Sequence, residues 1–261
     1  MIIDSFDDKS RPYITAKDIY GEAPRNDLVV IATFKKRVVD FVIEKYKATL
    51  YASFHTTNDF INIYSFKDKG KEFLIYMSGI TSPLASIIMN EVSTVTGAHK
   101  FIFFGSCGVL DEKKCRGKFI IPNSAIRDEG TSFHYLPASE EVEIRNHKVI
   151  EEVLKEKDIP YVVGKVWTTD AIYMETLNKV NQHKKEGAIA VEMEVSAVEA
   201  VGRYLDIDNY HLLFSADSLE GTKWERTDLG GDNELSLQIA SFGVALEIAH
   251  KISKKDTLFN L

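Results

Sequence analysis

The amino-acid sequence predicts an α/β fold of three layers, with helices on both sides of a mixed central sheet. Short apolar runs typical of buried strands alternate along the chain with stretches of helical spacing, and this alternation favours such a sandwich. The 261 residues, of which 44% are hydrophobic and 27% are charged, are enough to bury a large core. Because no repeat or low-complexity linker divides the chain, we expect a single domain over residues 1–261.

Strand and helix signals follow one another in the first half of the chain. Residues 28–32 form an apolar run typical of a strand, and residues 38–46 then show helical spacing. Residues 73–77 are the next strand candidate, and a helix is expected to start at Pro83, because proline suits the first turn of a helix. A third buried strand, residues 100–104, is expected to end at the glycine-bounded turn that follows it.

The second half continues the alternation up to a long final helix. Further strands are expected in the apolar runs at residues 119–122, 162–167 and 212–215. A buried strand at residues 188–191 is followed by helical spacing, and Asn233 is a suitable N-cap for the last amphipathic helix.

Charge and composition exclude several classes of function. The net charge of -7 is spread over both halves, and the basic run at residues 35–37 is too short for a nucleic-acid footprint. The chain begins without a signal-peptide pattern and has no apolar window of membrane-spanning length, so we expect a cytoplasmic protein with no membrane partner. Cys107 and Cys115 match no zinc pattern, which favours reduced, structural thiols and no metal.

Residues 187–200, GAIAVEMEVSAVEA, place charge where a buried strand turns into a helix. Glu192, Met193 and Glu194 therefore lie at the carboxyl end of a strand, where open α/β sheets bind ligands. A carboxylate there can accept both hydroxyls of a ribose, while the methionine packs on the apolar face of the sugar. The alternative is a capping cluster, since the helix dipole favours Glu near a helix N-terminus. The spacing alone does not separate the two.

This segment resembles the VEME signature of the nucleoside phosphorylase and nucleosidase superfamily, which includes hexameric purine nucleoside phosphorylase, uridine phosphorylase and methylthioadenosine nucleosidase. Four further blocks agree in order and spacing: ITAKDI at 14–19, FFGSCGVL at 103–110, TTDAIY at 168–173 and FSADSLEG at 214–221. The resemblance covers the chain from about residue 11 to the last helix, and it implies a fold of the nucleoside phosphorylase type.

The resemblance implies roles for the residues that hold the sugar and protonate the base. Glu194 matches the carboxylate that binds the ribose hydroxyls, and Met193 matches the methionine beneath the sugar, with Val191 on the approach to the site. Glu192 matches a position with a structural or water-positioning role. Asp217 matches an aspartate that donates a proton to N7 of a purine, so that the base leaves neutral. Its flanking residues 212–214 are apolar and could supply the desolvation that keeps the carboxyl protonated.

The base-binding positions favour a purine. Ile172 and Tyr173 occupy the place of the family's Phe-Tyr pair, so base stacking is expected from Tyr173 or from Trp167. Uridine phosphorylases carry a Gln-x-Arg clamp shortly after this pair, and the corresponding residues here are Thr176, Leu177 and Asn178. Since these side chains cannot make that bidentate contact, uracil is disfavoured.

The family's phosphate site is only partly kept. Arg37 matches one of two arginines, Thr33 replaces a glycine, and Ser106 beside Gly105 matches the family hydroxyl, but Phe103 stands in place of the second arginine. Losing one arginine–phosphate contact costs on the order of 1.5–3 kcal/mol unless another cation replaces it. The candidates for that replacement are Lys35, Lys36 and Arg226.

Other family contacts come from a neighbouring subunit or from the loop after Asp217. Arg11 and His55 are the nearest matches to side chains that reach a partner's site, so we expect a homodimer, or a hexamer built as a trimer of dimers. In purine enzymes of the family the later loop carries an arginine that holds the catalytic aspartate or the phosphate side, and Arg226 is the nearest match here, with Lys223 second. Trp224 in the same loop is either a core plug or a lid.

Three classes of function follow from these matches. We expect a purine nucleoside phosphorylase, a pentosyltransferase of purine salvage that uses inorganic phosphate as co-substrate and no cofactor. A hydrolytic nucleosidase is favoured by Phe103 and Thr33, which remove phosphate contacts. A uridine phosphorylase activity or a non-catalytic nucleoside-binding homologue are the remaining alternatives, and the retention of Glu194 together with Asp217 opposes the second of these.

Overall fold

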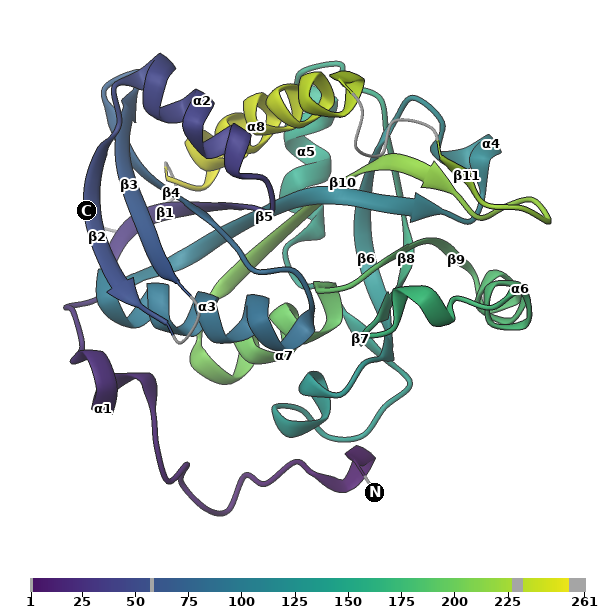
Figure 1. Ribbon diagram of the computed structural model, residues 1–261, viewed down its shortest axis with the longest axis horizontal. Helices are drawn as coiled ribbons and strands as arrows, with labels where there is room; N and C mark the ends of the chain where they lie inside the picture. Colours follow the sequence, from purple (N-terminus) through teal and green to yellow (C-terminus); the bar gives the residue numbers. More distant parts are fainter. Residues whose placement is uncertain (1, 57–58, 227–231, 254–261) are drawn as a thin grey trace, which may run out of the picture.

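In the computed structural model the strands form one mixed sheet, and helices cover both of its faces (Figure 1). The structure describes residues 2–56, 59–226 and 232–253. The predicted α/β architecture is confirmed, while the extent of the single domain over residues 1–261 stays a prediction. None of the helices in the described ranges is long and apolar enough to cross a lipid bilayer.

The elements alternate along the chain as the sequence pattern predicts. The strands are β1 (Asn26–Thr33), β2 (Thr49–His55), β3 (Phe60–Asp68), β4 (Lys71–Met77), β5 (Ala98–Val109), β6 (Phe119–Asp128), β7 (Glu141–Glu143), β8 (Tyr161–Thr169), β9 (Ala188–Glu192), β10 (Asp208–Ser218) and β11 (Glu225–Arg226). The α-helices are α1 (Ala16–Tyr20), α2 (Lys36–Tyr46), α3 (Ser82–Thr96), α4 (Glu112–Cys115), α5 (His147–Glu156), α6 (Leu177–Lys185), α7 (Val195–Leu205) and α8 (Asp232–Ile252). Within the described ranges, the short 3-10 helices are η1 (Ile2–Asp4), η2 (Thr131–His134) and η3 (Ile172–Met174).

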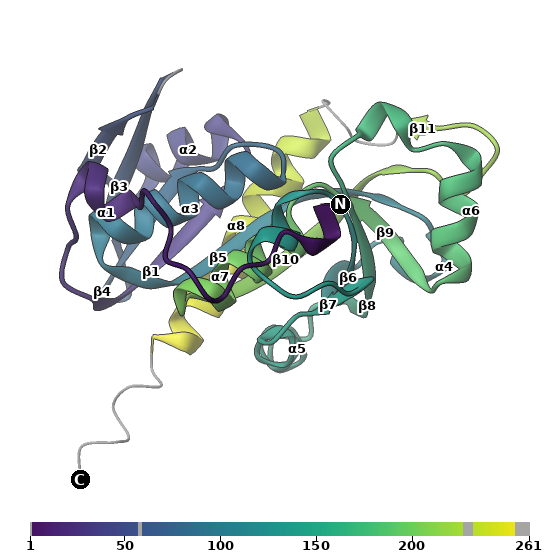
Figure 2. The same cartoon turned by 90° about the horizontal axis from the view of Figure 1, so that it is seen from below.

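The sheet is open at one end and closed at the other. Its strand order is β11-β10-β6-β8-β9-β5-β1-β4-β3-β2, and β7 pairs with β6. Because β10 also pairs with β5, the strands β5, β10, β6, β8 and β9 close into a ring. The open end with β2 and β3 and the closed end with β6, β8 and β9 lie on opposite sides of the molecule (Figure 2).

Apolar side chains bury the two faces of the sheet separately. On one face, β1, β4, β5 and β10 pack against α2, α5 and α8 around a core that includes Phe73, Phe104 and Phe242. On the other face, α3 and α7 cover a second core that includes Tyr76 and Phe101. Burying these apolar side chains stabilises the fold by roughly 25 cal/mol for each Å² of apolar surface removed from water. The two helical layers thus fix the sheet that carries the predicted site.

Two predicted boundaries were wrong. The third strand does not end at Gly105 but continues as β5 to Val109, because the residues after Gly105 pair with β10 on one side and with β9 on the other. The last helix begins at Asp232, so Asn233 is its second residue and not its N-cap. The hairpin of β2 and β3 was not predicted, since most of its side chains are exposed or half-buried and the hydrophobic pattern is weak.

Candidate active site

The register of three strands brings the predicted acid and the VEME segment together. Gly108 of β5 lies opposite Asp217 of β10 on one side and opposite Val191 of β9 on the other, three residues before Glu194. A Cβ at Gly108 would lie 2.5 Å from Leu219 Cδ1 and 3.4 Å from Asp217 Oδ1. The glycine therefore allows the two strands that carry the candidate site to approach β5 closely.

Glu194 is held against the N-terminus of α3. Its Oε1 accepts a hydrogen bond of 2.7 Å from the N–H of Thr81, the N-cap residue of this helix. Thr81 has a φ of 90°, a region that β-branched residues rarely adopt, and this strained backbone directs the N–H at the carboxyl group. The neighbouring Ser82 hydroxyl donates to the Met193 carbonyl at 2.7 Å. Two contacts thus fix Met193 and Glu194 at a helix end whose dipole favours a carboxylate.

Glu192 has a structural role. Its Oε2 accepts hydrogen bonds from the N–H groups of Glu194 at 2.6 Å and Val195 at 2.7 Å, which open α7. The hydroxyl of Thr168 donates to its other oxygen. The capping alternative is therefore confirmed for Glu192, which leaves Glu194 as the candidate ligand-binding carboxylate of the pair.

A buried polar network behind Glu192 was not identified from the sequence. Thr168 Oγ1 accepts the N–H of Ser196 at 3.1 Å, and the Ser196 hydroxyl donates to Glu129 Oε1 at 2.9 Å. Glu129 also accepts the N–H of Ser132 at 3.0 Å. Thr168 lies inside the TTDAIY block and could have been singled out, whereas Glu129 reaches the network only through the folding of β6 next to α7. These bonds hold the strand-to-helix turn rigidly.

Burial changes the acidity of both carboxyl groups in the VEME segment. Desolvation, and then the charge of Glu194, raises the pKa of Glu192 to about 8 against the effect of its hydrogen bonds. Desolvation raises the pKa of Glu194 to about 7, while the N–H of Thr81 lowers it. A proton on Glu194 is therefore released readily when positive charge develops nearby, as in the sugar of a glycosidic cleavage.

Asp217 lies near the end of β10 in a desolvated position. Burial raises its pKa, and a hydrogen bond from the Trp224 indole N–H, 2.7 Å from Oδ2, lowers it. Leu212 and Phe214, two of the residues expected to desolvate it, are buried. Arg226 lies opposite Asp217 in the β10–β11 pair, and Trp224 supplies a hydrogen bond to the Asp217 side chain that the sequence did not predict. Trp224 is 57% exposed and therefore is not a core plug.

The predicted base-binding residues separate into exposed and buried groups. Ile172 and Tyr173 belong to η3, and their side chains are 48% and 97% exposed, so both are open to a ligand. The expectation that Trp167 stacks on a base was wrong, because this side chain is fully buried and its indole N–H donates to Asp128 at 3.1 Å.

Glu175 is a titratable residue near Asp217 that the sequence analysis missed. It follows η3 directly, and its pKa is raised to about 7 by desolvation and then by the charge of Asp217. The site therefore carries a second carboxyl group close enough to Asp217 to influence its ionisation. No sequence signal connects the two, since they lie 42 residues apart along the chain.

Two of the predicted phosphate-site residues lie on neighbouring strands. Thr33, the last residue of β1, is buried and pairs with Phe104, so that Ser106 of β5 lies just beyond it. Arg37 is exposed in the first turn of α2, which starts three residues after β1. Anions bind well at helix N-termini of this kind.

Aromatic rings occupy part of the predicted phosphate place. A Cβ at Gly105 would lie 2.9 Å from the Phe34 ring, so this ring packs directly on the glycine. Phe103 is buried and stacks on His211 with 5.8 Å between ring centroids. Lys36, a proposed substitute for the second arginine, instead forms an ion pair of 2.7 Å with Asp40.

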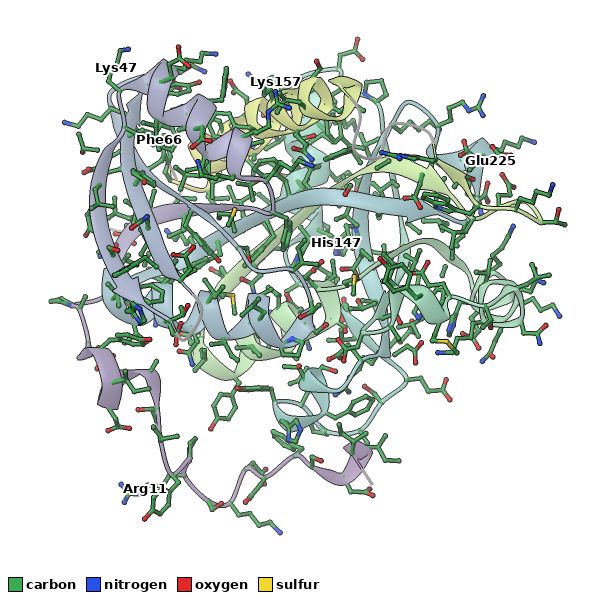
Figure 3. All side chains as sticks on the ribbon, viewed as in Figure 1. Arg11, Lys47, Phe66, His147, Lys157 and Glu225 are labelled. Carbon is green, nitrogen blue, oxygen red and sulfur yellow. The ribbon has the colours of Figure 1, made fainter. Side chains whose placement is uncertain are left out.

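The predicted intersubunit residues lie on two different parts of the surface. Arg11 belongs to the extended N-terminal arm, which runs along the outside of the molecule (Figure 3). It lines a hollow of about 280 Å³ together with His134, Tyr135 and Tyr204. His55 ends β2, is exposed, and packs edge-on against Phe60 with 4.8 Å between ring centroids.

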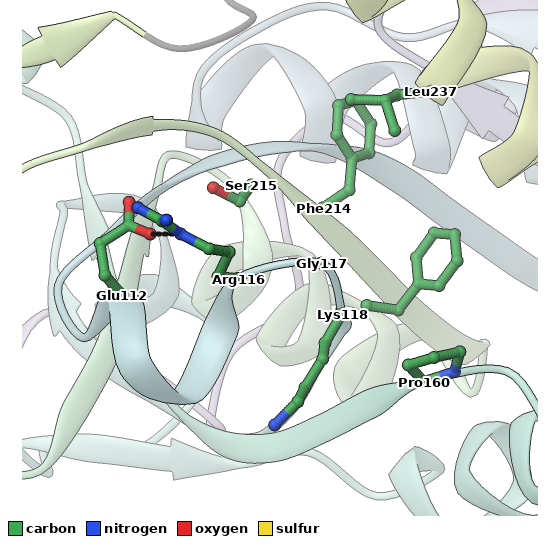
Figure 4. Close-up of a pocket in the computed structure, with 9 residues that line it drawn as sticks. Glu112, Arg116, Gly117, Lys118, Pro160, Phe214, Ser215 and Leu237 are labelled. Carbon is green, nitrogen blue, oxygen red and sulfur yellow. Dashed lines mark hydrogen bonds and ion pairs between the residues drawn. The ribbon is translucent and has the colours of Figure 1, made fainter.

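A separate cavity of about 400 Å³ lies between α4, β6, β10 and α8 (Figure 4). Phe119, Phe214 and Leu237 supply its apolar lining, and Arg116 pairs with Glu112 at its rim at 3.2 Å. None of the predicted site residues lines this cavity. The candidate site is thus the strand-end region around Glu194 and Asp217 and not this cavity.

Comparison with known proteins gives one family. The family model described as Phosphorylase superfamily matches residues 27–245. The chain is 30% identical over 154 residues to a purine nucleoside phosphorylase of the DeoD type from Alkaliphilus metalliredigens, an alignment that covers 58% of this chain and 66% of that protein. It is 29% identical over 137 residues to a guanosine phosphorylase from Halorubrum lacusprofundi, covering 51% and 56%. The chain thus matches less than two thirds of the length of these relatives.

A solved structure shares the fold. A futalosine hydrolase mutant of Helicobacter pylori superimposes with a TM-score of 0.70 over 87% of this chain and 100% of that one, at 15% sequence identity. At this identity the similarity shows the fold alone.

Proposed function

The chain belongs to the phosphorylase superfamily, and we propose that it is a purine nucleoside phosphorylase. Inorganic phosphate is the co-substrate in this proposal, and the products are a free purine base and ribose 1-phosphate. The observation that supports it most is the pairing of Gly108 with Asp217 on one side and with Val191 on the other, since Val191 lies in the strand that leads to Glu194. A proton donor and a sugar-binding carboxylate so placed fit the two ends of one nucleoside.

Each step of the proposed reaction has a residue to perform it. Glu194 accepts the ribose hydroxyls and stabilises the oxocarbenium-like sugar that forms as the C1′–N9 bond breaks. Asp217 transfers a proton to N7, so that the electron pair of the broken bond leaves on a neutral base. A phosphate oxygen then forms the new bond to C1′. Arg37 and Ser106 hold that phosphate.

The base side supports a purine over uracil. Thr176 is the N-cap of α6, where its hydroxyl accepts the N–H of Lys179, and Leu177 and Asn178 are exposed in the first turn. These residues do not form the paired donor and acceptor that a uracil clamp needs. The proton that Asp217 is proposed to donate fits N7 of a purine, a ring-nitrogen acceptor that uracil lacks.

Hydrolysis is the second candidate, and it is favoured by the aromatic rings near the phosphate place. Phe34 packs on Gly105 and Phe103 replaces a cation, which reduces the number of charged donors for an anion. A water molecule in place of phosphate would then attack C1′ and give free ribose. Arg37 in the first turn of α2 and Ser106 of β5, which match family phosphate donors, support phosphorolysis instead.

Phosphate dependence tests the choice between the two reactions. We expect base release from inosine to rise with phosphate concentration and to saturate, with ribose 1-phosphate as the product. Arg37→Ala should raise the KM for phosphate by about 10-fold to 100-fold, since a hydrogen-bonded charge pair contributes about 1.5–3 kcal/mol. Arg25→Ala is the matched control, because Arg25 is paired with Asp206 away from the site and should leave this KM unchanged. Purine release at full rate without phosphate, with ribose as product, would establish the hydrolase.

The surface next to α3 supports a homodimer. Ile80, Leu84 and Ile87 follow one another at helical spacing and are 56%, 42% and 53% exposed, with Phe60 of the nearby hairpin 57% exposed. Exposed apolar side chains in such a group mark a protein–protein contact. A second copy of the chain covering this surface would bring its own arm or hairpin, with Arg11 or His55, toward the site.

Dimerisation and activity should be lost together. We expect light scattering to show a dimer or a larger assembly at micromolar concentration. Ile87→Asp should produce a folded monomer with at least about 10-fold lower activity, because a charge at a buried contact costs several kcal/mol of association free energy. A monomeric wild-type protein with full activity would contradict the proposal.

A further inference from the structure

The loop between β10 and β11 folds back over the proposed acid. Two backbone pairs close the hairpin, Asp217 with Arg226 and Ser218 with Glu225. Trp224 lies directly before β11, and its indole N–H donates to Asp217 Oδ2 at 2.7 Å. The short ladder thus holds Asp217 itself and the two residues that follow Trp224 in the chain.

The exposure of Trp224 indicates that this contact is not a consequence of core packing. Its side chain is 57% exposed, whereas Trp167, the other tryptophan of the chain, is fully buried. A large aromatic side chain that remains in water gives up most of the free energy that its burial would provide. The hydrogen bond to Asp217 is therefore the specific interaction that the indole makes at this place.

The chemistry of the donor determines where a proton on Asp217 resides. An indole N–H can only donate, so Oδ2 must accept in both ionisation states of the carboxyl group. In the acid form this contact favours the proton on Oδ1, because a carbonyl oxygen is the better acceptor for the N–H, and Oδ1 is the oxygen that lies toward Gly108 and β5. An arginine in the same place would favour the ionised carboxylate through its charge, while the neutral indole orients the group and adds no charge.

We propose that Trp224 is a positioning residue of the general acid: its indole N–H holds Oδ2 of Asp217 and thereby presents the protonated Oδ1 to the leaving base. This inference rests on the proposed cleavage of a purine nucleoside. The other titratable or charged groups around Asp217 are Glu175 after η3, Cys107 of β5, and Lys223, Glu225 and Arg226 of the hairpin. These groups are acids, a thiol or cations, so their chemistry differs from that of the neutral N–H donor that holds Oδ2.

Trp224→Phe tests the inference by removing the N–H and keeping an aromatic ring. With inosine we expect kcat/KM to fall by about 10-fold to 100-fold, the size of effect that misplacement of a catalytic group produces. With 7-methylinosine, whose base already carries a positive charge and needs no proton at N7, the loss should be below about 3-fold. Equal losses with both substrates would overturn the inference, since they would show a general effect on the fold or on binding.

The pH profile gives a readout that a merely structural role would not move. The indole lowers the pKa of Asp217, so its removal should raise that pKa and move the alkaline limb of kcat/KM for inosine to higher pH. An unshifted limb in Trp224→Phe would contradict a contact between the indole and the acid.

A measurement without catalysis separates this inference from the proposed function. Wild-type fluorescence minus that of Trp224→Phe isolates the emission of Trp224, which should titrate with the carboxyl group that it contacts. The same transition should be lost in Asp217→Asn. If it persists in that variant, Trp224 does not report on Asp217 and the inference fails. If the protein cleaves no nucleoside but shows the Asp217-dependent fluorescence transition, the proposed function is rejected, while the contact between Trp224 and Asp217 is supported.

Discussion

Glu194→Ala is expected to lower kcat/KM for a purine ribonucleoside by about 10²–10⁴-fold, because two hydrogen bonds to a charged acceptor contribute about 1.5–3 kcal/mol each. The carboxylate is fixed by the Thr81 N–H at 2.7 Å and so meets the ribose without reorganisation. The loss should appear mainly in kcat, since the charge on the sugar develops only in the transition state. Steady-state kinetics with inosine and saturating phosphate measure it.

The substrate provides the control for Glu194. A 2′-deoxynucleoside lacks one of the hydroxyls that Glu194 is proposed to accept, so the same substitution should cost it roughly tenfold less than it costs the ribonucleoside. Glu192→Gln should instead lower the melting temperature, because Glu192 caps α7 through the N–H groups of Glu194 and Val195. An identical loss for both sugars would indicate that Glu194 does not read the hydroxyls.

The strand-to-helix turn shows what local pattern can and cannot predict. Apolar spacing places Glu192 and Glu194 correctly at the end of a buried strand, because that spacing depends on neighbours along the chain. Whether a carboxylate caps a helix or is available to a ligand depends on which amides face it. For Glu194 the amide is that of Thr81, which lies 113 residues away in the chain. The sequence alone therefore cannot show which of the two glutamates caps the helix and which is available to a ligand.

The acid's surroundings could not be predicted for a related reason. The family blocks identify Asp217. However, Gly105 was predicted to end a strand, whereas β5 continues past it, and Gly108 pairs with a strand on each side. Trp224 reaches Asp217 through the β10–β11 hairpin, and the sequence left open whether it is a core plug or a lid. Glu175 lies 42 residues before Asp217 in the chain, and no sequence signal connects the two. The fold follows from hydrophobic periodicity, whereas these side-chain contacts depend on which strands and loops lie next to one another.

Asp217→Asn is expected to reduce phosphorolysis of inosine by about 10²–10⁴-fold, the usual contribution of a general acid. The amide fills the same space but cannot give a proton to N7. A riboside with an activated leaving group, such as nitrophenolate, needs no such proton and should lose less than about 10-fold. Comparable losses with both substrates would show that Asp217 does not act as the acid.

The same substitution should raise stability where it lowers activity. Burial raises the pKa of Asp217 in the folded protein, so between its unfolded and folded pKa the folded state binds more protons. The wild-type free energy of unfolding therefore falls as pH rises through this window, and above it the fold contains an ionised carboxylate that is poorly solvated. The amide introduced by Asp217→Asn does not titrate, so this variant should lose less stability than the wild type over this range in urea denaturation. A parallel pH dependence of the two proteins would show that the carboxyl group is not destabilised by the fold, and a proton donor at neutral pH requires that destabilisation.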